Sequence, residues 1–173
     1  MILEMPQGEI FTMNWTNICE DPVLQNIPYK IQTDKWGNIL MSPATNEHGI
    51  YQAKIISLIS TLKKTGIVIS ECSVQTKEGV KVADAAWASN EYIKRNMGTN
   101  PYMEAPEICI EILSPSNTKN EMEEKKELYF ARGTLEFWIC DKQGNMEFYK
   151  NTGKIKHSSI IKDFPGKIII DSF

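Results

Sequence analysis

The sequence contains no long apolar run. No window approaches the roughly 18 consecutive apolar residues that a membrane-spanning helix needs. Residues 1–10 have no basic segment leading into an apolar one, so no signal peptide is expected. The four cysteines are widely spaced and form no CxxC or Cys/His pairing typical of a zinc site. The sequence therefore predicts a cytoplasmic protein with reduced cysteines and no membrane association.

Histidines and nucleotide-binding motifs are also scarce. His48 and His157 are the only two histidines, which leaves few bases for a serine or cysteine triad. The chain has no GxGxxG and no GxxxxGK phosphate loop. Positive charge is not in excess either, because 19 Lys and Arg stand against 22 Asp and Glu, a net charge of −3. Binding to nucleic acid by bulk charge alone is therefore disfavoured, whereas a local basic groove is not excluded.

The composition that is present is typical of one globular domain. The chain has 173 residues, of which 42% are hydrophobic and 24% charged. Residues 1–27, punctuated by prolines, are expected to form an irregular N-terminal arm, and residues 28–173 the domain itself. The order of elements indicates an α/β (α+β) single domain with a central mixed β-sheet flanked by helices. Periodicity predicts strands at 29–33, 38–41, 67–75, 80–89, 107–113, 135–141, 145–150, 156–161 and 167–170, a helix of about 17 residues before Gly66, and a helix at 118–132.

Two acidic residues interrupt apolar runs. Asp84 lies in Val82–Trp87, and Glu111 lies in Ile108–Leu113. A buried ionised carboxylate cannot stay unpaired, since its desolvation costs several kcal/mol. Each acid must therefore be neutral, salt-bridged, coordinated to a cation or at an exposed strand end. Both are hard oxygen ligands suited to Mg²⁺ or Mn²⁺, and the alternative is an ordinary acid on a half-exposed strand face.

A lysine and a histidine on the expected helices also stand out. Met122, Lys125 and Tyr129 follow helical spacing, so Lys125 lies on the face that should point inward, unlike Lys126. Lys125 is a structural ion-pair partner, a catalytic cation, or a stem whose ammonium reaches water. His48, in the first turn of the earlier helix, is either a capping or surface residue or part of a site.

These residues resemble the arrangement of the PD-(D/E)xK nucleases, with Asp84 on one strand, Glu111 on the next and a lysine on the following helix. More narrowly, the chain resembles the Uma-two (Uma2) family of restriction-endonuclease-like proteins over roughly residues 28–150. The resemblance implies a restriction-endonuclease-like core. It is carried by Met41-Ser42-Pro43 followed by His48, by APEICIEILSPS at 105–116, by Lys125 to Tyr129 with Gly133, and by EFWICD at 136–141.

Two positions depart from the pattern of the family. Ala83 precedes Asp84 where the family usually has proline, and Leu113 occupies the place of the lysine in the superfamily motif. The resemblance implies that the lysine has moved to the helix as Lys125, which agrees with the inward face derived above.

The resemblance implies a Mg²⁺-dependent (or Mn²⁺-dependent) endonuclease that hydrolyses phosphodiester bonds of DNA. Asp84, Glu111 and the main-chain carbonyl of Ile112 would hold the cation, which polarises the phosphate and lowers the pKa of its bound water. Lys125 would orient that water or neutralise the charge that develops on the phosphate.

Three further acidic or basic residues are weaker candidates. His48, or Glu47 beside it, would complete the site from the first long helix. Glu107 lies two alternations before Glu111, and hence on the same strand face, which makes it a candidate for the surroundings of the metal.

Two other functions are open at this point. In the first, the chain is a catalytically silent homo-oligomeric binding protein whose acids and lysine form only a buried ion-pair network. In the second, it is a metal-dependent hydrolase of a non-nucleic substrate. Mn²⁺ binding separates the silent protein from both enzymes, and cleavage of plasmid DNA separates the two enzymes. We also expect a homodimer, because apolar late strands and the N-terminal arm offer surface to cover and members of the family are expected to pair.

Overall fold

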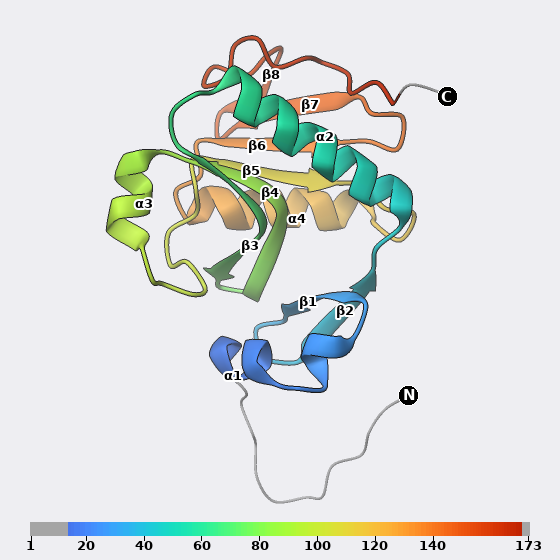
Figure 1. Ribbon diagram of the computed structural model, residues 1–173, viewed down its shortest axis with the longest axis vertical. Coiled ribbons are helices and arrows are strands. Elements are labelled where there is room, and N and C mark those ends of the chain that lie inside the picture. Colours follow the sequence, from blue (N-terminus) through green and yellow to red (C-terminus); the bar gives the residue numbers. More distant parts are fainter. Residues whose placement is uncertain (1–13, 171–173) are drawn as a thin grey trace, which may run out of the picture.

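The computed structural model describes residues 14–170 of the chain. This part contains a six-stranded mixed sheet, a separate two-stranded hairpin and four α-helices (Figure 1), which is the single α+β domain that the sequence predicts. No helix within it combines the length and the apolar character needed to cross a membrane. In chain order the elements are α1 (Trp15–Glu20), the 3₁₀-helix η1 (Leu24–Asn26), β1 (Tyr29–Thr33), β2 (Ile39–Pro43), α2 (Asn46–Leu62), β3 (Ile67–Thr76), β4 (Gly79–Ala88), α3 (Asn90–Asn96), β5 (Ile108–Ile112), α4 (Lys119–Ala131), β6 (Glu136–Cys140), β7 (Met146–Lys150) and β8 (Gly153–Ile155).

The six strands of the large sheet pair in the order β3-β4-β5-β6-β7-β8. Neighbours are antiparallel except for β5 and β6, which run parallel and are connected through α4. Every residue of β5 and β6 is buried, as is typical of central strands covered on both faces. A polar side chain on either strand must therefore find its partners within the protein.

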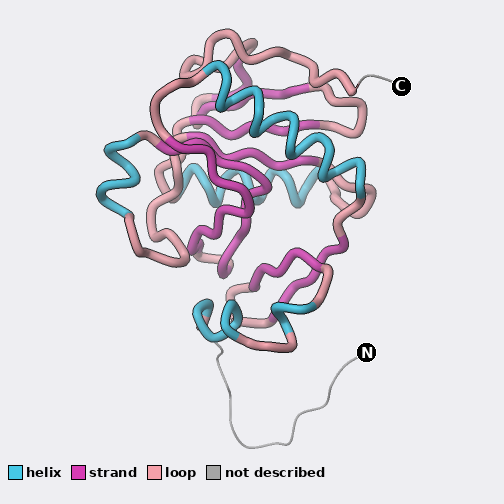
Figure 2. The backbone as a smooth tube through the Cα atoms, viewed as in Figure 1, coloured by secondary structure: helices cyan, strands magenta, loops and turns pink. Residues whose placement is uncertain are grey.

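Helices α2 and α4 cover opposite faces of this sheet (Figures 1 and 2). The even-numbered residues of β5 pack in the core that contains α2, whereas Cys109 packs with Met122 and Tyr129 of α4. Because the side chains of a strand alternate between its faces, Glu111 faces α4. The phase of that helix places Lys125 between Met122 and Tyr129, toward the same face of the sheet.

Both of these helices begin at capped residues. Thr45 Oγ1 accepts a hydrogen bond from the His48 N–H at the start of α2. Thr118 and Glu121 form the capping box that the sequence predicts at the start of α4. Such caps satisfy N–H groups that have no partner within the helix. They define where each helix begins, and so they position His48 and Lys125 relative to the sheet.

The β1–β2 hairpin docks on the part of β4 that β5 does not reach. β4 pairs with β5 only over residues 85–87, so N–H groups nearer its start need other partners. The side chain of Gln32 accepts a hydrogen bond from the Val82 N–H at 3.1 Å. Lys30 lies two residues earlier on the same face of β1, which brings it beside Asp84.

The strands predicted at 156–161 and 167–170 are wrong. The residues after β8 form loops, with one isolated bridge between Asn145 and Lys167 among them. The N–H groups of Ser159 and Ile160 donate to the carboxylate of Glu136 instead of to a neighbouring strand. Three apolar residues of this segment are buried in the core that contains α2: Ile161, Phe164 and Ile168.

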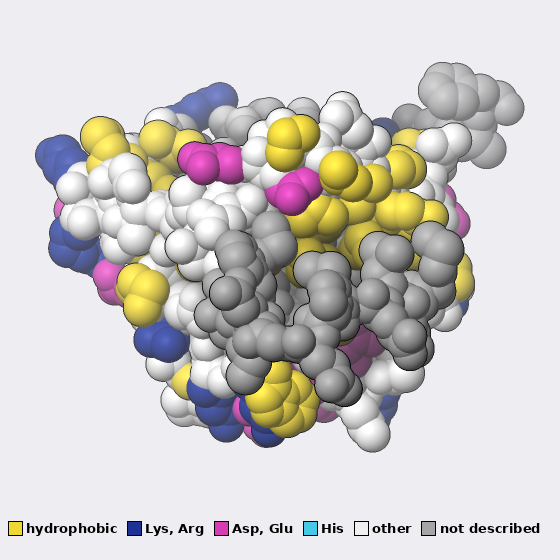
Figure 3. All heavy atoms as spheres, turned by 90° about the horizontal axis from the view of Figure 1, so that it is seen from below, with side chains coloured by type: hydrophobic (Ala, Val, Ile, Leu, Met, Phe, Trp, Pro, Cys, Tyr) yellow, Lys and Arg dark blue, Asp and Glu magenta, His cyan; other side chains and the backbone are white. Residues whose placement is uncertain are grey.

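Most of the apolar surface of the late segment is therefore buried within the domain, and Ile169 is its one strongly exposed large hydrophobic residue among the described residues. Several large hydrophobic side chains are exposed on and before the hairpin, among them Val23, Trp36, Leu40 and Met41. Figure 3 views the molecule from the hairpin end and shows hydrophobic side chains gathered on part of this face. The homodimer stays a prediction, for which light scattering would give twice the chain mass of 19.7 kDa.

The N-terminal arm is more regular than the sequence predicts. Residues 1–13 lie outside the described part of the chain, but α1 and η1 follow. Asn14 Oδ1 caps α1 by accepting a hydrogen bond from the Asn17 N–H at 2.9 Å, and Ile18 is buried. Trp15 Nε1 donates to Asn100 Oδ1 at 3.1 Å, so α1 contacts the loop after α3. The boundary between an arm at 1–27 and the domain stays a prediction.

Candidate active site

The pairing of the central strands stops at Asp84. The last pair between β4 and β5 in this direction is Ala85 with Ile110, and Asp84 and Glu111 lie one residue farther, where the two strands part. Oδ2 of Asp84 accepts a hydrogen bond from the Ile112 N–H at 2.7 Å, so a side chain replaces a backbone carbonyl as the acceptor. Acids from two neighbouring strands consequently meet at one opening of the sheet.

Strand β3 is irregular at the same level. Glu71 is absent from the β3–β4 pairing and has a φ of 50°, in the left-handed region that residues other than glycine rarely adopt. The Gln52 side chain of α2 donates to Glu71 Oε1 at 2.7 Å and to the backbone carbonyl of Asp84 at 2.6 Å. Residues held in such conformations gather at functional sites, and Glu71 lines the same pocket as Asp84.

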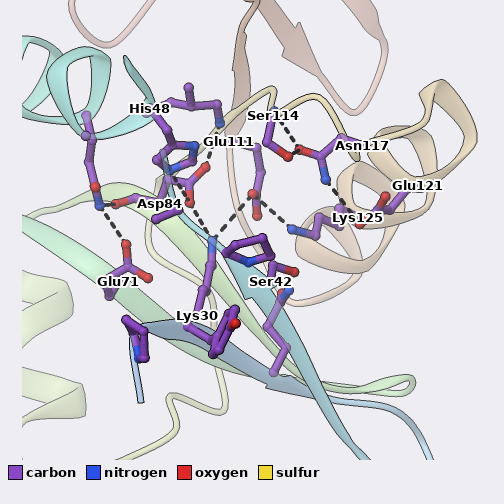
Figure 4. Close-up of a pocket in the computed structure, with 18 of the residues that line it drawn as sticks. Lys30, Ser42, His48, Glu71, Asp84, Glu111, Ser114, Asn117, Glu121 and Lys125 are labelled. Atoms are coloured by element: carbon purple, nitrogen blue, oxygen red, sulfur yellow. Dashed lines mark hydrogen bonds and ion pairs between the residues drawn. The ribbon is translucent and has the colours of Figure 1, made fainter. Parts of the chain in front are cut away.

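Three basic side chains converge on the two acids (Figure 4). Lys30 Nζ lies 2.5 Å from Asp84 Oδ1 and 3.8 Å from Glu111 Oε2. His48 Nε2 lies 3.2 Å from Asp84 Oδ1, and Lys125 Nζ lies 3.0 Å from Glu111 Oε2. The structure thus brings Asp84, Glu111, Lys125 and His48, which were proposed from the sequence, into one cluster. Lys30 is a fifth member.

The other oxygen of Glu111 is held by Tyr129. Its hydroxyl donates to Glu111 Oε1 at 3.0 Å, from a position one turn beyond Lys125 on α4. Every oxygen of the Asp84 and Glu111 carboxylates therefore has a hydrogen-bonding or ion-pair partner. This agrees with the described residues as a whole, in which no buried side-chain nitrogen or oxygen lacks a partner.

A pocket of about 360 Å³ opens over this cluster, within the usual size range of ligand sites. It lies between the hairpin, α2 and the start of α4. Asp84 and Glu111 are only 1% and 2% exposed, and form its floor. The side chains of Lys30 and His48 are 14% and 12% exposed, so a ligand that enters from solvent meets them before it meets the acids.

Burial and charge have opposite effects on the two acids. Burial favours a higher pKa for Asp84, but Lys30 and His48 outweigh it and hold this pKa well below its ordinary value. Burial dominates at Glu111 and raises its pKa, although Lys125 and Lys30 act against it. Neighbouring acids whose pKa values are displaced in opposite directions are typical of functional sites.

The basic groups are shifted toward their charged forms. Burial acts to lower the pKa of Lys30, but the charges of Glu111 and Asp84 outweigh it, so the pKa is raised. The hydrogen bond to Asp84 raises the pKa of His48, with burial acting against it. At neutral pH, Lys30 is consequently a permanent positive charge between the two acids.

Other residues that the sequence singled out lie elsewhere. The prediction that Glu107 borders the site is wrong, because its carboxylate accepts hydrogen bonds from the N–H and the hydroxyl of Ser89 at 3.1 and 2.5 Å. Ser89 caps α3, so Glu107 supports the start of that helix. Lys126 pairs with Glu123, away from the pocket. Glu47 is not among the residues of the described chain that line the pocket.

Lys30, Gln52, Glu71 and the contact that Tyr129 makes are not predicted from the sequence. Tyr129 left a signal, because it follows Lys125 by four residues on one helix face. Lys30 left none, since a lysine in a short strand of alternating polar and apolar residues normally faces solvent. Only the docking of the hairpin on β4 turns it inward.

Asp84 and Glu111 are chemically suited to bind a divalent cation, but the ammonium group of Lys30 already lies between them. Within residues 14–170, no group of three or more His, Cys, Asp and Glu is placed to hold a metal ion. Two carboxylates are oxygen ligands of the kind that Mg²⁺ and Mn²⁺ prefer, with water completing the coordination. A cation shared by Asp84 and Glu111 would take the place of the Lys30 ammonium.

The fold is similar to that of a solved nuclease-like protein. The crystal structure described as "a putative nuclease belonging to DUF820" from Anabaena variabilis matches with a TM-score of 0.58 and 21% sequence identity, covering 66% of this chain and 68% of that chain. At this identity the likeness shows the fold alone. No protein of curated function matches the chain.

The family is shown by the sequence itself. The model of the Uma2 family, described as "Putative restriction endonuclease", matches residues 36–163. The chain therefore belongs to the Uma2 family of restriction-endonuclease-like proteins. The matched segment contains His48, Asp84, Glu111 and Lys125, whereas Lys30 precedes it.

Proposed function

We propose that this member of the Uma2 family is a Mg²⁺-dependent endonuclease that hydrolyses phosphodiester bonds of DNA, with Mn²⁺ as an alternative cation. The observation that carries the proposal is the meeting of two buried acids from neighbouring strands, Asp84 and Glu111, with the Lys125 amine 3.0 Å from Glu111, in one pocket. Two carboxylates and an amine are groups that metal-assisted hydrolysis of a phosphodiester uses.

In this proposal Asp84 and Glu111, with the main-chain carbonyl of Ile112, hold the cation. When bound, the cation polarises the phosphate and lowers the pKa of a coordinated water. Lys125 and Tyr129 hold the two oxygens of Glu111 from α4, which gives this carboxylate one orientation. The Ile112 N–H does the same for Asp84. Ligands held in this way need little reorganisation when the cation enters.

Lys125 and His48 act on the reacting groups. Lys125 Nζ carries a positive charge and donates hydrogen bonds, so it orients the attacking water and offsets the negative charge that develops on the phosphate. His48 Nε2 lies 3.2 Å from Asp84 Oδ1. It keeps that carboxylate in place through Nε2, and a proton exchange with the reacting groups would use its other ring nitrogen, Nδ1.

DNA as the substrate is supported by the family and by the presence of basic side chains in the pocket, not by the net charge of −3. Lys30, His48 and Lys125 line the pocket and could contact a phosphate, although Glu71, Asp84, Glu111 and Glu121 line it as well. Binding that depends on phosphate contacts weakens as salt is added. Cleavage should accordingly fall with rising ionic strength.

One observation favours a silent binding protein instead. Each oxygen of Asp84 and Glu111 already has a partner, as in a purely structural ion-pair network. Such a protein would show no rise in melting temperature with Mn²⁺. A hydrolase of a non-nucleic substrate would bind Mn²⁺ without cutting DNA.

Cleavage of supercoiled plasmid tests the proposal. The wild-type protein should produce nicked and linear DNA with Mg²⁺ or Mn²⁺ and none with EDTA, and Asp84→Asn should produce none in any buffer. Lys126→Met, outside the pocket, is the matched control and should cut like the wild type. Cleavage by Asp84→Asn at the wild-type rate would contradict the proposed site. Stabilisation by Mn²⁺ without cleavage would instead support the non-nucleic hydrolase.

A further inference from the structure

Lys30 lies between the two acids, where a shared divalent cation would be bound. Its Nζ is 2.5 Å from Asp84 Oδ1 and 3.8 Å from Glu111 Oε2. Figure 4 shows its side chain reaching from β1 into the space between them. Lys125 differs, because the ion pair of its amine is with Glu111. Among the lysines at residues 14–170, Lys30 is the one paired with both acids.

The hairpin keeps the backbone of Lys30 in place independently of the acids. The side chain of Gln32 accepts a hydrogen bond from the Val82 N–H at 3.1 Å, and Thr33 Oγ1 accepts one from the Val80 N–H at 2.8 Å. Both bonds attach β1 to β4 without involving either carboxylate. The backbone of Lys30 would therefore stay beside the pocket if its amine left the acids.

We propose that the Lys30 ammonium is a built-in substitute for the divalent cation. It pairs with both Asp84 and Glu111 in the metal-free protein, and it leaves the space between them when the cation binds. This inference rests on the proposed metal site. The ammonium and a divalent cation exclude each other, because they repel and compete for the same carboxylate oxygens. The divalent cation consequently binds only by displacing the Lys30 ammonium, and this competition weakens the affinity of the site for the cation.

The pocket offers the displaced ammonium another partner. The four-carbon stem of lysine is flexible, and the pocket that Lys30 lines has a volume of about 360 Å³. Glu71 is exposed and lines the same pocket, so its carboxylate is an anion within the same space. The phosphate group of a substrate that enters this pocket would be a second anion with which the ammonium could pair. Exchange therefore does not require the ammonium to be left without a counter-charge.

Calorimetric titration with Mn²⁺ tests the inference. Lys30→Met keeps the stem and removes the charge, and should bind Mn²⁺ at least about tenfold more tightly than the wild type, since a unit charge competing within about 4 Å is removed. Lys35→Met, on the exposed part of the hairpin beside Trp36, is the matched control and should bind like the wild type. Equal affinity of Lys30→Met and wild type would overturn the inference alone. Absence of binding in all three proteins would overturn the metal site and the inference together.

A second measurement uses the unchanged protein, because Lys30→Met leaves two buried acids with one cation fewer and so lowers stability. Brief acetylation with acetic anhydride, followed by mass spectrometry, reports which amines are accessible. Labelling of Lys30 should rise several-fold when Mn²⁺ is added, while labelling of Lys35 stays constant. Unchanged labelling of Lys30 at saturating Mn²⁺ would mean that its amine remains between the acids, and the inference would be wrong.

Discussion

The amine of Lys125 lies 3.0 Å from Oε2 of Glu111, although the two residues belong to a helix and a strand and are 14 positions apart. Leu113, two residues after Glu111, takes the place of the lysine of the superfamily motif and packs, partly buried, against the core beneath α4, so this strand provides no amine of its own. The helix supplies it. This pair joins the element that carries the acid to the element that carries the cation, and the proposed mechanism depends on it.

Replacing Lys125 by Met should abolish DNA cleavage without weakening Mn²⁺ binding, because lysine is not a metal ligand and its charge opposes the cation. Met keeps the apolar stem, so the variant separates charge from packing. Lys126→Met on the same helix, whose amine pairs with Glu123, should cut at the wild-type rate. Plasmid cleavage and Mn²⁺ calorimetry measure the two properties. A Lys125→Met protein that cuts normally would remove this residue from the mechanism.

Replacing Asp84 by Ala should abolish both cleavage and the rise of melting temperature with Mn²⁺, because the change removes a ligand. The control is Glu91→Ala, which removes an exposed acid from α3 and should preserve both properties. Thermal unfolding with and without Mn²⁺ measures the binding. If Asp84→Ala kept the full Mn²⁺-dependent rise, the cation would have to bind elsewhere.

Replacing Tyr129 by Phe should lower the free energy of unfolding by about 1–3 kcal/mol, because a buried carboxylate oxygen of Glu111 loses its donor. Tyr149→Phe is the matched control. Its hydroxyl also donates to a carboxylate, that of Glu147, but in a partly exposed position, where water replaces it and the loss should stay within about 0.5 kcal/mol. Urea denaturation measures both. Equal losses of unfolding free energy in the two variants would show that burial of the contact between Tyr129 and Glu111 adds nothing to stability.

Glu136 should make stability depend on pH in the acid range. Burial acts to raise the pKa of its carboxyl group, but hydrogen bonds from Ser159, Ser158 and Trp138 outweigh it, so the pKa is lowered. The unfolded chain then binds the proton more tightly than the folded protein does. The stabilisation is fully present above the ordinary glutamate pKa of 4.5, and it is lost as the pH falls through the lower folded value.

Glu136→Gln should therefore lower the free energy of unfolding by about 2 kcal/mol at pH 7, because an amide nitrogen faces donors that the carboxylate had satisfied. The difference between wild type and variant should shrink as the pH is lowered below 4.5. Urea denaturation over a pH series measures it. A difference that stays constant down to acid pH would contradict the role of the ionised carboxylate.

The part of the site that could be predicted from the sequence is the part that leaves local signals. Asp84 and Glu111 are charges inside apolar runs, and the spacing of Lys125 within its helix is enough to turn it inward. The mixed sheet was predictable for the same reason, because the order of helices and strands restricts the ways in which they can pack.

Tertiary contacts decided the rest. The face that Lys30 presents depends on the hydrogen bond between Gln32 and the Val82 N–H, which no pattern within β1 encodes. The late segment contains short apolar runs, and such a run predicts burial without distinguishing a strand from a packed loop. There the carboxylate of Glu136 binds the N–H of Ser159 that a strand would have used for pairing.

The central claim is that Asp84 and Glu111 share one divalent cation. Its most direct test is anomalous scattering from a crystal of the protein soaked in Mn²⁺. The account predicts one anomalous peak, about 2.2 Å from a carboxylate oxygen of each acid, with the Lys30 amine displaced from between them. No peak at this position, with the Lys30 amine still between the two carboxylates at a saturating Mn²⁺ concentration, would contradict it.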